Sequence, residues 1–256
     1  MSTALAQALV AARRQQQRLV AAAWAQALQD PAQAYAVQDA VAAELAWFLL
    51  APPSHWKSGG ASRDTVLSHA PLPPAGVRAS PAQFAQWPMH GRAIEAEIAL
   101  RLGRAVSPAQ AAALQADPQP AAIDALIDAL AVSIEICDSR WHEGAQAPAL
   151  LRLADLQSHA GLALGDWQPY QRRDWTTQRC EVQIGVQPPV VRRGTHSLAD
   201  PAWLLPQWLC HATRDGHSVA AGTVVTTGSW IGMLPAQEGD AVQVAFDGIG
   251  AASLQL

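Results

Sequence analysis

Four charged side chains carry the strongest chemical signal in the sequence. Lys57 is the only lysine among 17 basic residues, so arginine stands at every other basic position. Arginine cannot supply a compact ammonium group whose pKa responds to burial, which makes Lys57 a candidate catalytic residue. Glu95 and Glu97 are two residues apart, and Glu135 occurs in a second segment with a similar pattern.

The three glutamates are expected to lie on neighbouring strands. Apolar and polar residues alternate over residues 94–102, which places Glu95 and Glu97 on one face of a strand. Residues 132–137 alternate in the same way around Glu135. Convergent carboxylates repel each other without a cation, and an all-oxygen site suits Mg²⁺ or Mn²⁺. A solvent-facing strand with ordinary glutamates is the alternative for an isolated Glu-x-Glu pair.

The first 88 residues divide into a helical part and an irregular part. Residues 1–50 are rich in alanine, leucine and glutamine and lack glycine, which predicts two helices with a break at Asp30-Pro31. Proline, glycine, serine and histidine dominate residues 51–88, which predicts a long loop that carries Lys57. We interpret this loop as part of an active site rather than as a linker.

The remainder is predicted to be mixed and β-rich. Helices are expected at residues 120–130 and 202–211. Short strands separated by glycine turns are expected near residues 162–164, 180–186, 223–227 and 241–246. No βαβ repeat is visible, so the strands are expected to be antiparallel or rolled.

Composition excludes several classes of protein. The chain has 256 residues, half of them hydrophobic, and a formal charge of -4, which is typical of a globular protein and gives no basic footprint for nucleic acid. No stretch is long and apolar enough for a membrane span, and the first residues do not follow the order of a signal peptide. Three separated cysteines favour neither a disulfide framework nor a zinc site. We therefore expect a cytoplasmic protein.

Short segments along nearly the whole chain resemble a known family. In chain order they are residues 34–38 (AYAVQ), 56–59 (WKSG), 94–99 (IEAEIA), 134–135 with 138–140 (DSR), 154–155 with Ser158, Gly165, 222–228 (GTVVTTG), 238–240 (EGD) and 248–250 (GIG). Together they resemble the 2-oxopent-4-enoate hydratase and 4-oxalocrotonate decarboxylase group of the fumarylacetoacetate hydrolase superfamily. Each segment is unspecific alone, and the signal is in their order and spacing.

The resemblance implies a fold and a set of site residues. The fold would be α+β, with a helical N-terminal portion and the lysine-bearing loop over residues 1–75, followed by a mixed β-roll catalytic domain over residues 76–256. The metal ligands, Mg²⁺ or Mn²⁺ being the ion, would be Glu95, Glu97 and Glu135. The remaining implied or candidate residues are the active-site Lys57, the substrate-contacting Ser158, the turn residues Thr227 and Gly228, and His55 as a candidate acid or base.

The resemblance also implies a reaction class. The leading expectation is a metal-dependent hydro-lyase that converts a 2-hydroxy-2,4-dienoate into a 4-hydroxy-2-oxo acid. Decarboxylation of a 2-oxo acid and hydrolytic C–C cleavage of an acylpyruvate are alternatives, because one fold hosts all three reactions. A non-catalytic subunit that supports a partner enzyme of the same pathway is a further alternative. A small-molecule 2-oxo acid substrate and a homo-oligomer are expected, without nucleic acid or membrane as partner.

One feature of the family's hydratases is missing. They carry an acidic residue before the Glu-x-Glu pair, whereas residues 76–92 contain no Asp or Glu, and Asp64 is the nearest acid upstream. His90 and Arg92 precede the strand and are candidates to replace it. The hydrolases of the superfamily use a His–Glu pair to activate water. His55 with Glu44, or His142 with Glu143, would be the pair here.

Overall fold

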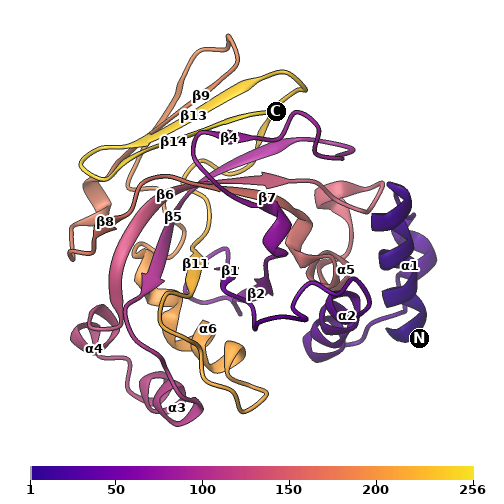
Figure 1. Cartoon of the computed structure of the whole chain (residues 1–256), viewed down its shortest axis with the longest axis horizontal. Coiled ribbons are helices and arrows are strands. Elements are labelled where there is room, and N and C mark those ends of the chain that lie inside the picture. The colour runs from indigo at the N-terminus through magenta and orange to yellow at the C-terminus, as the bar shows by residue number, and fades with distance from the viewer. Residues whose placement is uncertain (1) are drawn as a thin grey trace.

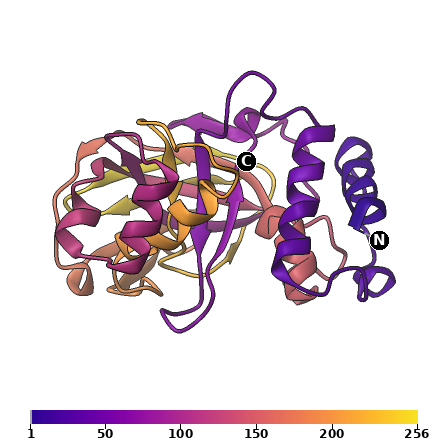
Figure 2. The same ribbon diagram turned by 90° about the horizontal axis from the view of Figure 1, so that it is seen from below.

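The N-terminal helices form a small unit with a core of its own. The computed structural model describes residues 2–256. Helices α1 (Ser2–Gln15) and α2 (Pro31–Glu44) pack on α5 (Ala149–Ala154), at the right of Figures 1 and 2. Asp30 caps α2 by accepting a hydrogen bond from the backbone N–H of Gln33, and Pro31 occupies the first turn, as the break at Asp30-Pro31 predicts. The unit therefore combines the N-terminus with a helix from the middle of the chain.

A large mixed sheet forms the body of the molecule. Its strands follow the order β2-β1-β11-β5-β6-β7-β3, with β12 paired to β5 and β8 paired to β6. The bounds are β1 His55–Gly59, β2 Ser68–Pro71, β3 Val77–Ala79, β5 Ala93–Leu102, β6 Ile127–Cys137, β7 His159–Leu164, β8 Gln168–Pro169, β11 Val224–Thr226 and β12 Leu234–Pro235. The long β5–β6 pair lies at its centre.

A second sheet packs across the first and closes the roll. Its order is β10-β9-β13-β14-β4, and Figure 1 shows its C-terminal strands lying over β6 and β7. The bounds are β4 Ala82–Gln83, β9 Arg179–Ile184, β10 Val190–Arg193, β13 Ala241–Phe246 and β14 Gly250–Gln255. Strand β13 alternates buried and exposed residues, so its apolar side chains enter the main core between the sheets.

Shorter helices cover the end of the roll remote from α1. These are α3 (Pro108–Ala116), α4 (Pro120–Asp124) and α6 (Leu205–Ala212). Short 3₁₀ turns complete the chain at η1 Ala21–Trp24, η2 Pro74–Gly76, η3 Gly144–Gln146, η4 Leu156–Ser158, η5 Trp175–Thr177 and η6 Pro201–Leu204. No helix within residues 2–256 is long and apolar enough to cross a membrane. The architecture is the predicted α+β fold with N-terminal helices and a mixed β-roll.

Two predicted elements are wrong. The predicted helix over residues 120–130 ends at Asp124, and β6 begins at Ile127, because its residues pair with β5 from Leu102 onward. The predicted loop over residues 51–88 contains β1, β2, β3 and β4. Strand β1, which carries Lys57, pairs with β11 and β2. The segment that carries Lys57 therefore belongs to the large sheet and is not a loop.

Candidate active site

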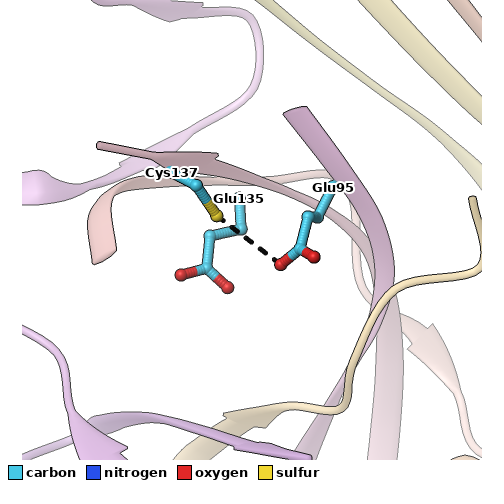
Figure 3. Close-up of side chains that lie close together, drawn as sticks. All are labelled: Glu95, Glu135 and Cys137. Carbon is cyan, nitrogen blue, oxygen red and sulfur yellow. Dashed lines mark hydrogen bonds between the residues drawn. The ribbon is translucent and has the colours of Figure 1, made fainter. Parts of the chain in front are cut away.

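The register of β5 and β6 brings two of the predicted metal ligands face to face. Glu95 is directly opposite Glu135 in this antiparallel pair, and Glu97 is opposite Ser133. Residues directly opposite each other project to the same face of a sheet. Figure 3 shows the side chains of Glu95 and Glu135 side by side, with Cys137 next to them. One ligand atom from each of these three residues lies within 4.8 Å of the others.

Glu97 lines the same cavity, but hydroxyl groups hold its carboxylate. The Thr226 hydroxyl donates a hydrogen bond to Glu97 Oε2, and a 2.8 Å hydrogen bond joins the Thr226 and Ser133 hydroxyls. Glu97 is therefore adjacent to the Glu95–Glu135 pair without being part of the tightest cluster. Turning its side chain away from Thr226 would complete the predicted triad.

Lys57 and a buried histidine hold the third carboxylate. Lys57 Nζ donates to Glu135 Oε1 at 2.5 Å and to the carbonyl of Gln157 at 3.3 Å. His159 Nδ1 lies 3.0 Å from the same Glu135 oxygen. Because a carboxylate only accepts hydrogen bonds, Nδ1 carries the proton in this contact. Strand β1 thus brings the only lysine of the chain to the carboxylates of β5 and β6.

The electrostatics of the cluster are unbalanced. Burial, followed by repulsion from Glu135, raises the pKa of Glu95 to about 7 and that of Glu97 to about 8. Burial opposes the charge of Glu135 as well, but Lys57 and His159 outweigh it and lower the pKa of Glu135. Burial also acts against the charge of Lys57, yet the surrounding carboxylates raise its pKa, so Lys57 stays protonated. Three carboxylates therefore share one ammonium group.

A divalent cation fits this donor set. Glu135 Oε2 is buried and has no hydrogen-bond partner among residues 2–256, so an acceptor is left open on the most enclosed of the carboxylates. Repulsion among the carboxylates would be relieved by positive charge at the same point. Oxygen donors select Mg²⁺ or Mn²⁺ over softer metals. Burial raises the pKa of the Cys137 thiol well above its usual value, so Cys137 is a neutral neighbour that donates to Glu95 Oε2 at 3.6 Å.

The cluster opens into a cavity of about 480 Å³. Lys57, Glu95, Glu97, Ser158 and Gly228 line this cavity, as the resemblance implies. Within residues 2–256 the Ser158 hydroxyl makes no hydrogen bond to the protein, so it is free for a ligand.

Two of the predicted site residues are placed elsewhere. Thr227 is completely buried, and its hydroxyl donates to the carbonyl of Ile98 at 2.7 Å. Successive strand residues point to opposite faces, so Thr226 faces the carboxylates and Thr227 faces away. His55 does not line the cavity, and its Nδ1 lies 3.0 Å from the Ser54 hydroxyl. Neither His55 nor Thr227 lines the cavity in this structure.

Arginines line the wall of the cavity beyond the carboxylates. Arg18, Arg92 and Arg152 all contribute to the lining. Asp138 also lies there, and the backbone N–H groups of His90 and Gly91 donate to its carboxylate at 3.1 and 2.9 Å. The arginines form a cationic wall in which Arg18 pairs with Asp138 at 3.6 Å and Arg92 pairs with Glu238 at 3.2 Å.

Several residues of the site were not predicted from the sequence. The His–Glu pair of the structure is His159–Glu135, whereas Glu44 pairs with Arg14, and Glu143 accepts from the backbone N–H of Ala21. His159 directly follows the matched Ser158, and this adjacency is the signal that would have found it. Gln157 contributes only its backbone carbonyl, so the residue type at this position gives no sign of the contact.

Comparisons with known proteins identify the family. The family model for the fumarylacetoacetate (FAA) hydrolase C-terminal domain matches residues 58–256. The chain belongs to the fumarylacetoacetate hydrolase family. A search of curated proteins found no match. The match begins one residue after Lys57 and contains all three glutamates.

Solved structures agree with this assignment. The 4-oxalocrotonate decarboxylase from Pseudomonas putida G7, complexed with magnesium and adipate, superposes with a TM-score of 0.81 at 18% identity, covering 99% of this chain and 96% of that one. The same enzyme complexed with calcium and acetate gives 0.79. The 2-hydroxyhepta-2,4-diene-1,7-dioate isomerase from Mycobacterium marinum gives 0.56 at 16% identity, covering 80% and 74% of the two chains. The decarboxylase thus shares the fold over both the helical unit and the roll.

Proposed function

We propose that the protein is a divalent-metal-dependent lyase that acts on a short 2-oxo acid or its dienol. The reaction we put first is hydration of a 2-hydroxy-2,4-dienoate to a 4-hydroxy-2-oxo acid. The observation that carries the proposal is the unbalanced cluster of Glu95, Glu97 and Glu135 around Lys57, of which Glu95, Glu97 and Lys57 line an open cavity and Glu135 is buried behind them.

The glutamates would hold the ion, and the lysine would move protons. Glu95 and Glu135 present adjacent oxygens, and Glu97 would join them by leaving Thr226. A Mg²⁺ or Mn²⁺ ion held there would supply Lewis acidity toward the keto oxygen of a 2-oxo acid. Lys57 holds a proton at Nζ within the cavity, so it offsets the charge of an anionic substrate. The carboxylate charge that raises the pKa of Lys57 would be neutralised by the bound cation, and Lys57 would then transfer its proton to a substrate carbon.

Hydroxyl groups support the hydration reaction. Ser158 offers its hydroxyl to the cavity without a competing protein partner, which suits it to orient a substrate oxygen or the attacking water. The acid that the family's hydratases carry before the Glu-x-Glu pair is absent from this chain. Arg92, one of its two candidate replacements, lines the cavity, whereas His90 does not.

Decarboxylation is a second candidate, favoured by the cationic wall. Arg18, Arg92 and Arg152 suit a substrate with a second carboxylate, which a 2-hydroxypentadienoate lacks. Loss of CO₂ requires an electron sink and a proton donor but no base to activate water. The decarboxylase with the same fold was solved with adipate, which is a dicarboxylate.

The test is an assay of both reactions by proton NMR. Purified protein with Mg²⁺ is mixed in parallel with 2-hydroxypenta-2,4-dienoate and with 4-oxalocrotonate, and Glu97→Gln is the matched inactive control. Formation of 4-hydroxy-2-oxopentanoate from the first establishes hydration, and loss of CO₂ from the second establishes decarboxylation. A metal-loaded protein that binds oxalate but converts neither substrate contradicts the lyase proposal and indicates a non-catalytic subunit or an acylpyruvate hydrolase.

Three expectations from the sequence stay proposals. They are a cytoplasmic location, a homo-oligomer, and association with a partner enzyme of the same pathway. Light scattering on the purified protein measures the mass of the particle and tests the second of these.

A further inference from the structure

The turn just before β7 has an unusual backbone. Leu156, Gln157 and Ser158 have φ angles of +53°, +50° and +65°, so three consecutive residues are in the left-handed region. None of them is glycine, the one residue that adopts this region without a steric penalty. A backbone of this kind persists only where the surrounding structure holds it.

A buried aspartate ties the turn to two other segments. Asp155 Oδ1 accepts from Arg13 Nη2 at 2.9 Å and from Arg140 Nε at 2.6 Å, while Oδ2 accepts from the backbone N–H of Arg140 at 2.9 Å. Its carbonyl accepts from the backbone N–H of Ser158 at 3.0 Å. The carbonyl of Ser158 in turn accepts from the backbone N–H of Asp138 at 2.7 Å. Arg13, on α1, is the one member of this network from the N-terminal helices.

The turn delivers three consecutive residues to the site. The Gln157 carbonyl accepts a hydrogen bond from Lys57, Ser158 lines the cavity, and His159 contacts Glu135. A change in the turn would therefore move three groups together: Lys57, the Ser158 hydroxyl, and His159, which contacts the predicted metal ligand Glu135.

We propose that Arg13 is a positioning residue: through Asp155 it holds the left-handed turn at residues 156–158 in the form that places the Gln157 carbonyl on Lys57 and the Ser158 hydroxyl in the cavity. This proposal rests on the proposed lyase function for its catalytic consequence. It assigns the N-terminal helix a part in the reaction, although that helix lies outside the roll and outside the cavity lining.

The geometry separates this role from general stabilisation. When Arg13 is removed, Asp155 keeps Arg140, which holds it by its side chain and by its backbone N–H. The buried carboxylate therefore retains a counter-ion, and we expect the fold to survive. The substitution removes only the hydrogen bond from α1 to Asp155 Oδ1, which Arg140 Nε also contacts.

The experiment compares Arg13→Ala with Arg14→Ala. Arg14 lies on the same helix, carries the same charge and pairs with Glu44 at the exposed surface, so it is a matched control. Hydrogen exchange of the metal-free proteins is measured over residues 155–159, and kcat, KM and Mg²⁺ affinity are measured with the substrate that the wild type converts. For Arg13→Ala we expect faster exchange at the turn and a fall in kcat of about tenfold to a hundredfold, with Mg²⁺ affinity unchanged. Arg14→Ala should match the wild type in all four.

A second variant tests the mechanism through the backbone. Gln157→Gly in the Arg13→Ala background removes the penalty of the left-handed region at its centre and keeps the carbonyl that Lys57 contacts. We expect it to recover part of the lost kcat, and we expect Arg13→Lys to recover more because it restores a cation beside Asp155. Equal exchange and equal kcat in Arg13→Ala and Arg14→Ala would overturn the proposal. A wild type without turnover but with faster turn exchange in Arg13→Ala would instead contradict the lyase function and leave the holding role of Arg13 established.

Discussion

Two groups of buried acidic residues, the Asp155 network and the glutamate cluster, differ in how their charge is balanced. Asp155 lies between Arg13 and Arg140, and each of its carboxylate oxygens has a hydrogen-bond donor. In the glutamate cluster three carboxylates face one lysine, and nothing in the described part of the chain donates a hydrogen bond to Glu135 Oε2. The first network is complete within the chain. The second is complete only with an added cation, and this difference distinguishes a structural network from a binding site.

The pKa values express the same contrast. Burial and mutual repulsion raise the pKa of Glu95 to about 7 and that of Glu97 to about 8. Around Asp155 the excess charge is positive instead: burial, and then Arg140, lower the pKa of Arg13 to about 9. Substitutions that remove charge should therefore have opposite effects on stability at the two places.

The largest effect is expected from the ligands themselves. Glu97→Gln keeps the shape of the side chain and removes a charge that the cation requires. We expect metal affinity and metal-dependent activity to fall by more than about a hundredfold, the upper end of what outer-shell substitutions cost. Calorimetric titration with Mn²⁺ measures the affinity. Glu181→Gln, on the exposed surface of β9, is the matched control, and full metal-dependent activity in Glu97→Gln would refute the ligand assignment.

The next largest effect on activity is expected from substitutions of Lys57. Lys57→Ala should lower kcat by about 10² to 10⁴, the range typical of a positioned acid or base. Lys57→Arg should be nearly as damaging, because a guanidinium group does not release a proton near neutral pH. Steady-state kinetics with the converted substrate measure both. Recovery of activity by arginine would show that the position needs only a positive charge.

Removing a charge from each network should change the free energy of unfolding in opposite directions. Asp155→Asn leaves Arg13 and Arg140 without a buried counter-ion, so we expect a loss of about 3–5 kcal/mol in the free energy of unfolding. Glu97→Gln relieves repulsion, so the metal-free protein should be unchanged or more stable. Urea denaturation without metal measures both variants, with Asp247→Asn at an exposed ion pair as the control. A destabilised metal-free Glu97→Gln would contradict the unbalanced charge that we assign to the cluster.

The smallest effect is a pH dependence of the metal-free protein. The pKa values of Glu95 and Glu97 are raised from 4.5 in the folded state, so the folded state binds more protons than the unfolded one between pH 4.5 and about 8. Stability contributed by these groups is therefore present at low pH and lost as the pH rises through this window. Burial lowers the pKa of His69, His196 and His211, which makes stability rise with pH up to about 6.5. The decline is therefore measured as the difference in thermal unfolding between the wild type and Glu97→Gln from pH 5 to 8. Saturating Mg²⁺ should flatten it and raise the midpoint, since a ligand at about 100 times its Kd adds about 2.7 kcal/mol.

Local patterns in the sequence determined the chemistry of the site. Alternation with a period of two places Glu95 and Glu97 on one face whatever strand lies beside them, and the lone lysine marks position 57. The order of short segments indicated the family and the α+β fold, which the family model and the structure confirm. These features can be predicted from the sequence because they depend only on residue type and on neighbours along the chain.

Only the tertiary structure decided which groups meet. Lys57 lies on a strand because β1 pairs with β11, where Lys57 is opposite Thr226, and no local pattern reports a partner so far along the chain. The same pairing turns Thr226 toward Glu97 and Thr227 away from the cavity. His159 meets Glu135 across the β6–β7 pair, and Arg13 reaches Asp155 from a separate helix. Periodicity fixes the face of an element, whereas burial and pairing over the whole chain fix its neighbours.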